Sequence, residues 1–185
     1  MKIRSVGDLQ EHVNAGNKVK YVFFWGHQNK GMEVSKSCFS QWYESDFNDS
    51  GIKYITAEHY MMAEKAKLFN DRSTYEKIIN ASNPGEAKSL GREVIGFDEA
   101  VWVSHRFEIV VRGNLLKFEQ NLNLKEFLLS TGDRVLVEAS PVDKIWGVGL
   151  SGDSRNIENP NLWRGLNLLG FALMEVRDVL SQTNA

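Results

Sequence analysis

The chain has 185 residues, 42% of them hydrophobic and 25% charged, with a formal net charge of −2. A chain of this length can bury one core and is short for two, so we expect a single domain spanning residues 1–185. The small net charge argues against broad electrostatic binding to duplex nucleic acid or to an anionic membrane, although a local basic pocket remains compatible with it.

The cysteine content and the N-terminus bear on the cellular compartment. Cys38 is the only cysteine, which excludes an internal disulfide and fits a reducing compartment. The N-terminus has no apolar core of signal-peptide length, and nowhere does the sequence contain a run of about 18 apolar residues. We therefore expect a cytoplasmic location and no membrane partner.

The first fifty residues predict short elements. Residues 5–16 have the apolar spacing of an amphipathic helix that ends at Gly16. Residues 19–25 are rich in β-branched and aromatic side chains and predict a buried strand, followed by a turn over 26–31. Residues 37–43 have weak periodicity, for which we expect a loop or a bent strand.

The stretch from Thr56 to Lys65 combines titratable and apolar residues on one predicted helix. Thr56 is a good N-cap after the extended run 52–55, so the helix begins near Ala57. Glu58 and Lys65 then share a face, two turns or about 10 Å apart, which suits a ribose with a phosphate. The alternative is structural: Glu58 complements the helix dipole and Lys65 covers the core with its stem.

Three further helices follow. Residues 74–80 form a brief helix, and 84–92 form another, with Asn83 as its cap and a proline at its first position. Asp98 caps the longest helix, roughly 99–121. Its apolar residues lie on more than one face, which predicts a largely buried helix.

The C-terminal part completes the fold class. Residues 122–129 predict a short helix, and 135–139 predict a strand that leads into the loop 140–149. The last helix covers about 161–181, and Gly170 within it indicates a close helix contact. Mostly helices with two or three short strands predict an α+β fold that is predominantly helical.

Several common functional signals are absent. The four histidines are scattered without the paired spacing of a zinc site, so we predict no metal and no cofactor. The glycines of 147–152 match the spacing of a dinucleotide fingerprint, but they follow a loop where that fingerprint follows a strand. Cys38 has no obvious base nearby in the sequence, which disfavours a cysteine hydrolase.

The remaining functional signal in the sequence is a set of acidic residues together with aromatic residues. Glu58 lies on the predicted helix, and Glu138 and Asp143 lie at the end of the strand and in the loop after it. Two carboxyl groups and a stacking surface are what cleavage of a sugar–nitrogen bond requires. We expect the helix dipole to keep Glu58 ionised, and a more buried Asp143 to be the acid. By composition alone these residues are more often structural, and each tryptophan is core by default.

Motifs in a fixed order resemble the NADAR domain, the YbiA-like N-glycosidase family. The resemblance runs from about residue 20 to 180, which leaves residues 1–19 as an N-terminal addition. The motifs are Phe39-Ser-Gln-Trp42, Thr56-Ala-Glu-His-Tyr60 with Ala63 and Lys65, Ala87 with Leu90-Gly-Arg92, Trp102, Lys117-Phe118, Leu136-Val-Glu-Ala139 with Asp143 and Trp146-Gly-x-Gly149, and Asn167-x-Leu-Gly170 with Leu173-Met-Glu-x-Arg177.

The resemblance implies an enzyme that hydrolyses the bond between ribose C1′ and a base nitrogen. Family activities act on phosphoribosylamino-pyrimidine intermediates of riboflavin synthesis or on guanine ADP-ribosylated in nucleic acid. The residues carried over as catalytic are Glu58, Lys65, Glu138 and Asp143. Trp102 and Trp146 are carried over as aromatic positions, and Arg92 and Lys117 match basic positions and are candidates for phosphate. With Trp42, His59 and Tyr60 from the same motifs, these are the residues predicted to bind substrate.

Two mechanisms and two other classes of function fit this sequence. In one mechanism Asp143 or Glu138 protonates the leaving base while Glu58 orients water; in the other, Lys65 attacks C1′ and forms an imine. The alternative functions are a non-catalytic module that binds ADP-ribose or a similar ligand, and a structural or partner-binding domain. The mild acidity of the chain favours a small-molecule substrate over nucleic acid.

Overall fold

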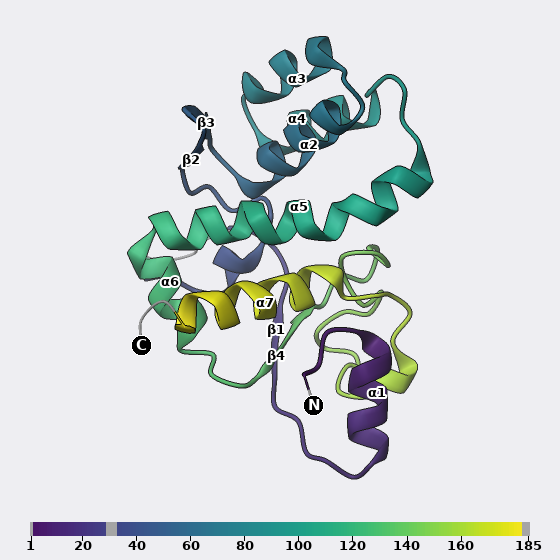
Figure 1. Cartoon of the computed structure of the whole chain (residues 1–185). Helices are drawn as coiled ribbons and strands as arrows, with labels where there is room; N and C mark the ends of the chain where they lie inside the picture. Colours follow the sequence, from purple (N-terminus) through teal and green to yellow (C-terminus); the bar gives the residue numbers. More distant parts are fainter. Residues whose placement is uncertain (1, 29–32, 183–185) are drawn as a thin grey trace.

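The computed structural model describes residues 2–28 and 33–182, and within them the chain is predominantly helical with short strands, as the sequence predicts (Figure 1). Part of the turn predicted at 26–31 lies outside the described residues. The helices are α1 Val6–Asn14, α2 Ala57–Leu68, α3 Arg72–Ile79, α4 Pro84–Arg92, α5 Glu99–Gln120, α6 Leu122–Leu129 and α7 Leu168–Gln182, with 3-10 helices η1 Lys36–Phe39 and η2 Pro160–Leu162. The strands are β1 Tyr21–Phe24, β2 Phe47–Asp49, β3 Ile52–Tyr54 and β4 Val135–Glu138.

Side-chain caps set where the central helices begin. Thr56, Asn83 and Asp98 each have extended backbone, and each side chain accepts a hydrogen bond from the peptide N–H three residues on. Such a bond satisfies one of the free amides of the first turn. All three predicted caps are therefore confirmed, and Asp71 caps α3 in the same way.

The strands form two separate pairs. β1 and β4 are parallel, with Phe24 opposite Glu138, and β2 and β3 form an antiparallel hairpin whose turn residues Ser50 and Gly51 have positive φ. In Figure 1, α7 crosses over β1 and β4, α5 runs above α7, and α2, α3 and α4 form a further group beyond α5. The cavity described below lies where this group meets the end of β4.

Two segments differ from their predictions. Residues 37–43 contain part of a buried 3-10 helix, η1, where a loop or bent strand is expected. The last helix begins at Leu168, not near 161, because residues 164–169 make a series of peptide hydrogen bonds back to residues 144–148. Leu166 is consequently 48% exposed and does not belong to the buried face of α7.

Helix α5 is less buried than predicted. Its buried residues recur at spacings of three and four, from Trp102 through Val110 to Phe118, which describes one stripe. Val101 and Val103 are substantially exposed. The apolar residues on its other faces therefore remain in contact with solvent, and α5 is an amphipathic helix.

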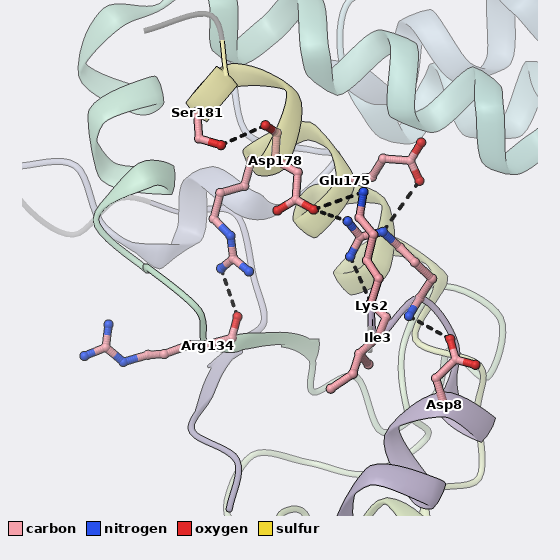
Figure 2. Close-up of polar contacts among 9 residues, drawn as sticks. Lys2, Ile3, Asp8, Arg134, Glu175, Asp178 and Ser181 are labelled. Atoms are coloured by element: carbon pink, nitrogen blue, oxygen red, sulfur yellow. Dashed lines mark hydrogen bonds and ion pairs between the residues drawn. The ribbon is translucent and has the colours of Figure 1, made fainter. Parts of the chain in front are cut away.

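The N-terminal segment is held against the C-terminal helix. Arg4 forms ion pairs with Asp178 and Glu175, and Lys2 also pairs with Asp178 (Figure 2). Leu9 on α1 is fully buried.

Among the described residues, no helix is both long and apolar enough to cross a membrane.

Candidate active site

A cavity of about 340 Å³ lies between helices α2, α4 and α5, the end of β4 and the loop that follows it. This volume is near the lower end of the range for small-molecule sites. The lining residues are Ser40, Gln41, Trp42, Glu58, Met61, Met62, Lys65, Lys88, Gly91, Arg92, Trp102, Glu138, Asp143, Ile145, Trp146 and Leu169. Eight of the eleven residues predicted for the site are therefore brought together here.

Helix α2 contributes one face to the cavity. Glu58, Met61, Met62 and Lys65 all line it, at relative positions 0, +3, +4 and +7. Those are the positions that share a face of an α-helix. The peptide N–H of Glu58 also donates to the carbonyl of Gln41, which ties the start of α2 to the segment that carries Trp42.

Glu58 is a buried acid with an unused oxygen. The residue is 3% exposed, and its Oε1 has no hydrogen-bond partner within the described part of the chain. Burial raises the pKa of Glu58 to about 7, against lowering effects from the charge of Lys88 and a hydrogen bond from the Trp42 side chain. The prediction that the helix dipole keeps Glu58 ionised is wrong in direction, because the cost of desolvating the carboxylate is larger.

Glu138 provides a second acid at the C-terminal end of β4. Its Oε2 is buried and, in residues 2–28 and 33–182, has no hydrogen-bond partner. Burial is the main cause that raises the pKa of Glu138 to about 8; the charges of Asp143 and Glu58 raise it further, and Lys88 lowers it. At neutral pH, Glu138 is thus the carboxyl group that retains its proton more firmly.

Asp143 lies in a different environment from the one predicted. The side chain is only half-buried, and its Oδ1 accepts hydrogen bonds from the peptide N–H groups of Ile145 and Trp146, both at 2.8 Å. The expectation that Asp143 is the more buried acid is therefore wrong. Its oxygen shapes the loop, and its negative charge raises the pKa of the two buried glutamates.

Lys65 lies at the other end of the α2 face. Its Nζ donates to the carbonyl of Gly91 at 2.8 Å and sits 4.2 Å from the ring centroid of Phe97 and 5.6 Å from that of Trp102. Burial lowers the pKa of Lys65, with Glu99 acting in the opposite direction. A lysine whose pKa is lowered has a larger neutral fraction, which is the form that can act as a nucleophile.

Aromatic and cationic side chains complete the cavity. Trp42, Trp102 and Trp146 provide flat apolar surfaces, and Arg92 lines the cavity from α4. Lys88, also on α4, was not predicted as a site residue, yet it lines the cavity 5.7 Å from the Trp42 ring centroid. Helical spacing would have identified it, because residues 88, 91 and 92 share one face of α4.

His59 and Tyr60 do not line the cavity. The ring of His59 lies between the Thr56 hydroxyl and the carbonyl of Ala81, at 2.7 and 3.2 Å. Nε2 therefore donates to the carbonyl and Nδ1 accepts from the hydroxyl, in the neutral form favoured by a pKa that burial lowers. The Tyr60 hydroxyl donates to Asp49. Both residues point away because consecutive helix positions lie about 100° apart.

Lys117 is also outside the cavity. It is fully buried, and its Nζ donates to the carbonyls of Cys38 and Ser40 at 2.7 and 3.0 Å. Burial lowers its pKa to about 8. Lys117 therefore supports η1 from the buried stripe of α5, and the structure does not place it where a bound phosphate could reach.

The site can bind a small polar molecule and exchange protons with it. It has two buried carboxyl groups with different proton affinities, three cationic side chains and three tryptophans around one cavity. Tryptophans suit a heteroaromatic base, and ammonium and guanidinium groups suit phosphate oxygens. This combination is the one that cleavage of a bond between a phosphorylated sugar and a base requires.

Comparisons with known proteins identify related chains. Residues 23–181 match the model of the NADAR domain. N-glycosidase R617 of Acanthamoeba polyphaga mimivirus is 44% identical over 164 residues, which cover 86% of this chain and 95% of the viral one. The maize riboflavin biosynthesis protein PYRR, chloroplastic, is 35% identical over 145 residues, or 75% of this chain and 22% of the maize protein.

A solved structure has the same fold. The NMR structure of the Escherichia coli protein YbiA superimposes with a TM-score of 0.72 at 27% sequence identity. The match covers 91% of this chain and 89% of YbiA. The predominantly helical architecture is therefore shared with that protein.

Proposed function

The chain belongs to the NADAR domain family and is an N-glycosidase, a hydrolase of N-glycosyl compounds, and we propose that it cleaves a phosphoribosylamino-pyrimidine at ribose C1′. Relatives carry the name N-glycosidase, and the maize relative is named for riboflavin biosynthesis. Phosphoribosylamino-pyrimidines are intermediates of that synthesis, as the resemblance of the sequence implies.

The observation that carries this proposal is the pair of buried glutamates. Glu58 and Glu138 both line the cavity, and each has a buried carboxyl oxygen that has no hydrogen-bond partner among the described residues. A buried polar atom without a partner is costly unless a ligand or water satisfies it. Two such acids are what N-glycoside hydrolysis uses, one to protonate the base and one to activate water.

The surroundings of the two carboxyl groups support different roles: Lys88, Arg92 and a hydrogen bond from Trp42 favour the ionised form of Glu58, whereas burial and the charges of Asp143 and Glu58 favour the protonated form of Glu138. Glu138, with the higher pKa of about 8, donates a proton to the departing base nitrogen as the bond from C1′ breaks. Glu58, with a pKa of about 7, is the group that ionises first and accepts a proton from the water that attacks C1′. The products are the free base and ribose 5-phosphate. Glu138 has lost one proton and Glu58 has gained one.

The cavity size and its cations support a phosphorylated monosaccharide substrate. A volume of about 340 Å³ suits a single nucleotide-sized ligand better than an ADP-ribosyl group. Lys88 and Arg92 lie one helical turn apart on α4, and both line the cavity. We assign them to the 5-phosphate, in place of the pair Arg92 and Lys117 predicted from the sequence.

A second candidate substrate is ADP-ribosylated guanine, in nucleic acid or free. Arg92 is exposed although it lines the cavity, so a longer substrate could extend past it into solvent. The same acids would act on the same C1′–nitrogen bond. The alternative of a non-catalytic module is disfavoured by the two unpartnered carboxyl oxygens of the described cavity, because binding alone does not need two acids of high pKa.

The experiment is to offer the purified protein a phosphoribosylamino-pyrimidine and an ADP-ribosylated guanine oligonucleotide in parallel, and to measure release of each base. We expect faster cleavage of the pyrimidine substrate, with the Lys88→Gln/Arg92→Gln double variant raising KM roughly tenfold or more. Preferred cleavage of the oligonucleotide would favour the second candidate. Tight binding without cleavage over hours would favour the non-catalytic module.

A further inference from the structure

The outer edge of β4 is closed by a side chain. β4 pairs with β1 along one edge, where the N–H groups of Val135 and Ala139 donate to carbonyls of Lys20 and Phe24. On the other edge, the carbonyl of Leu136 and the N–H of Glu138 would be available to a further strand. No further strand is present there in the described chain, and both groups are bound by the side chain of one residue, Asn167.

The side-chain amide of Asn167 makes the two bonds that a strand would make. Its Nδ2 donates to the carbonyl of Leu136 at 2.9 Å, and its Oδ1 accepts from the N–H of Glu138 at 3.0 Å. This role needs a donor and an acceptor on two separate atoms of one short planar group, which the side-chain amide of asparagine provides. Asn167 is fully buried, so neither bond is exchanged for water.

Both backbone polar groups of Asn167 are also hydrogen-bonded. Its N–H donates to the carbonyl of Gly147 at 3.1 Å, and its carbonyl accepts from Phe171 in the first turn of α7. Its φ is +52°, a left-handed conformation that asparagine tolerates better than most residues. Asn167 thus joins β4, the loop that contains Asp143 and the start of α7 at one point.

The packing around this junction leaves no room for adjustment. A Cβ on Gly170 would lie 2.1 Å from the carbonyl oxygen of Leu136 and about as close to the Asn167 amide. The close contact predicted at Gly170 is therefore a contact with strand β4. A Cβ on Gly147 would lie 2.9 Å from the carbonyl oxygen of Glu138. Backbone atoms on both sides of Glu138 are consequently held in place.

We propose that Asn167 is a positioning residue, whose amide holds the end of β4 and thereby sets where the Glu138 carboxyl group lies in the cavity. It does not touch the substrate, since it is absent from the lining of the cavity described above. The role rests on the proposed function of Glu138 as the acid. A displacement of about 1 Å in a reacting group is enough to reduce turnover about 100-fold.

The surroundings of Glu138 explain why its position matters. The surrounding elements place both positive and negative charges near the Glu138 carboxyl group. A small movement of that group therefore changes how strongly burial and repulsion raise its pKa and how strongly attraction lowers it. α5 and α7 contribute the uncharged residues Trp102 and Leu169 to the cavity. The titratable and charged groups that face Glu138 across the cavity are Glu58 and Lys65 on α2, Lys88 and Arg92 on α4, and Asp143 in the loop.

Arg177 offers a matched control. It is also on α7 and also buried, and its Nη1 donates to the hydroxyl of Thr131 and to the carbonyl of Arg134, just before the other end of β4. Figure 2 shows the hydrogen bond to the Arg134 carbonyl. Arg177→Gln removes two hydrogen bonds from α7 to the segment just before β4, whereas Asn167→Gly removes two hydrogen bonds from the residue just before α7 to β4 itself, next to Glu138.

The test measures turnover and the titration of Glu138 in Asn167→Gly, Asn167→Ser and Arg177→Gln. Glycine accepts the positive φ and removes the amide. Serine keeps one short hydroxyl that can make at most one of the two bonds and adds no charge, which provides a milder variant if the glycine protein does not fold. Titration is followed by NMR on protein with ¹³C-labelled glutamate carboxyls, and Glu138→Gln identifies the signal.

We expect Asn167→Gly to lower kcat about 10- to 100-fold with KM changed less than about threefold, and to lower the midpoint of the Glu138 titration. Arg177→Gln should change neither kcat nor the midpoint of the Glu138 titration, even if it lowers the melting temperature as much as Asn167→Gly does. Equal kcat and equal titration in both variants would overturn the proposal. The NMR titration needs no substrate, so it tests whether Asn167 positions Glu138 even if neither candidate substrate is cleaved.

Discussion

Glu58 shows how burial and a helix dipole compete at one residue. A carboxylate in the first turn of a helix gains about 0.3 to 1 kcal/mol from the dipole. The rise of the Glu58 pKa from 4.5 to about 7 corresponds to about 3 kcal/mol in favour of the protonated form, at 1.36 kcal/mol per pKa unit. Desolvation therefore decides the protonation state. The same carboxyl group on an exposed helix would be ionised at neutral pH.

Glu58→Gln tests both the chemistry and the electrostatics of that residue. We expect turnover to fall roughly several hundredfold or more, because glutamine cannot accept a proton from water. The fold should be retained, since glutamine has nearly the same shape. A Glu58→Gln protein that keeps near-normal turnover would refute the assignment of the site.

The stability of Glu58→Gln should depend on pH in a defined direction. The folded-state pKa of Glu58 is raised, so wild-type stability is fully present below the unfolded pKa of 4.5 and declines as the pH rises to about 7. Glutamine does not carry this cost. We expect the variant to match the wild type at pH 4 and to exceed it by about 1 to 3 kcal/mol at pH 8, measured by urea unfolding. Equal stability at both values would contradict the raised pKa.

Lys65 can be tested as a nucleophile by borohydride trapping. If Lys65 attacks C1′ and forms an imine, reduction with borohydride in the presence of substrate produces a stable adduct on that residue. Lys65→Arg is the matched control, because arginine keeps the charge and forms no imine. Because the proposed mechanism has water attack C1′ directly, we expect no adduct in active wild-type enzyme, as checked by mass spectrometry. A substrate-dependent adduct in the wild type that is absent from Lys65→Arg would instead show that Lys65 is the nucleophile.

Among the elements, α2 is the one that relates the core to the site. One face carries Glu58 and Lys65 into the cavity, and the opposite side carries His59 and Tyr60 into the interior. The Tyr60 ring packs directly on α5, where a Cβ on Gly113 would lie 2.5 Å from the ring. The spacing between these two helices therefore sets the position of the face of α2 that lines the cavity.

Gly113→Ala tests this contact. Replacing glycine by alanine within a helix normally stabilises it by about 1 kcal/mol. Here the rigid Tyr60 ring has to move, and overpacking of a core costs about 1 to 3 kcal/mol, so we expect a net loss of stability. Gly7→Ala in α1 is the control, because a Cβ on Gly7 would meet only the Ser5 hydroxyl within 4 Å, at 3.6 Å. Thermal unfolding of both variants should show opposite signs.

Across the whole molecule, the N-terminal segment and the family domain form one packed structure. The match to the family begins at residue 23, after α1. Gln10 on α1 donates to the carbonyl of Pro160 in η2, and Leu9 is fully buried. None of the described α1 residues lines the cavity. We therefore propose that residues 1–19 are an addition that contributes stability but no chemistry.

Leu9→Ala separates these two contributions. Truncation of a buried leucine costs about 2 to 5 kcal/mol, so we expect a clear loss in the free energy of unfolding. The catalytic constants should remain within about twofold of the wild type at temperatures where the variant is folded. A large change in kcat or KM for the folded variant would show that α1 influences the site.

Local patterns in the sequence were sufficient for most helices and for much of the site. Capping side chains such as Thr56, Asn83 and Asp98 act within one turn, so their effect is readable from residues three positions apart. Ordered motifs brought Glu58, Glu138 and Trp146 into one hypothesis, and all three line one cavity. Helical spacing alone would also have excluded His59 and Tyr60 and included Lys88.

The protonation states and the start of α7 depended on contacts between segments far apart in the sequence. Glu58 and Glu138 are 80 positions apart, and the pKa of each reflects water excluded by other elements. Lys117 resembles a phosphate ligand by residue type, but its environment is the buried carbonyls of η1. Desolvation and long-range hydrogen bonds such as those of Asn167 exist only once the chain is packed, because they depend on distances in space.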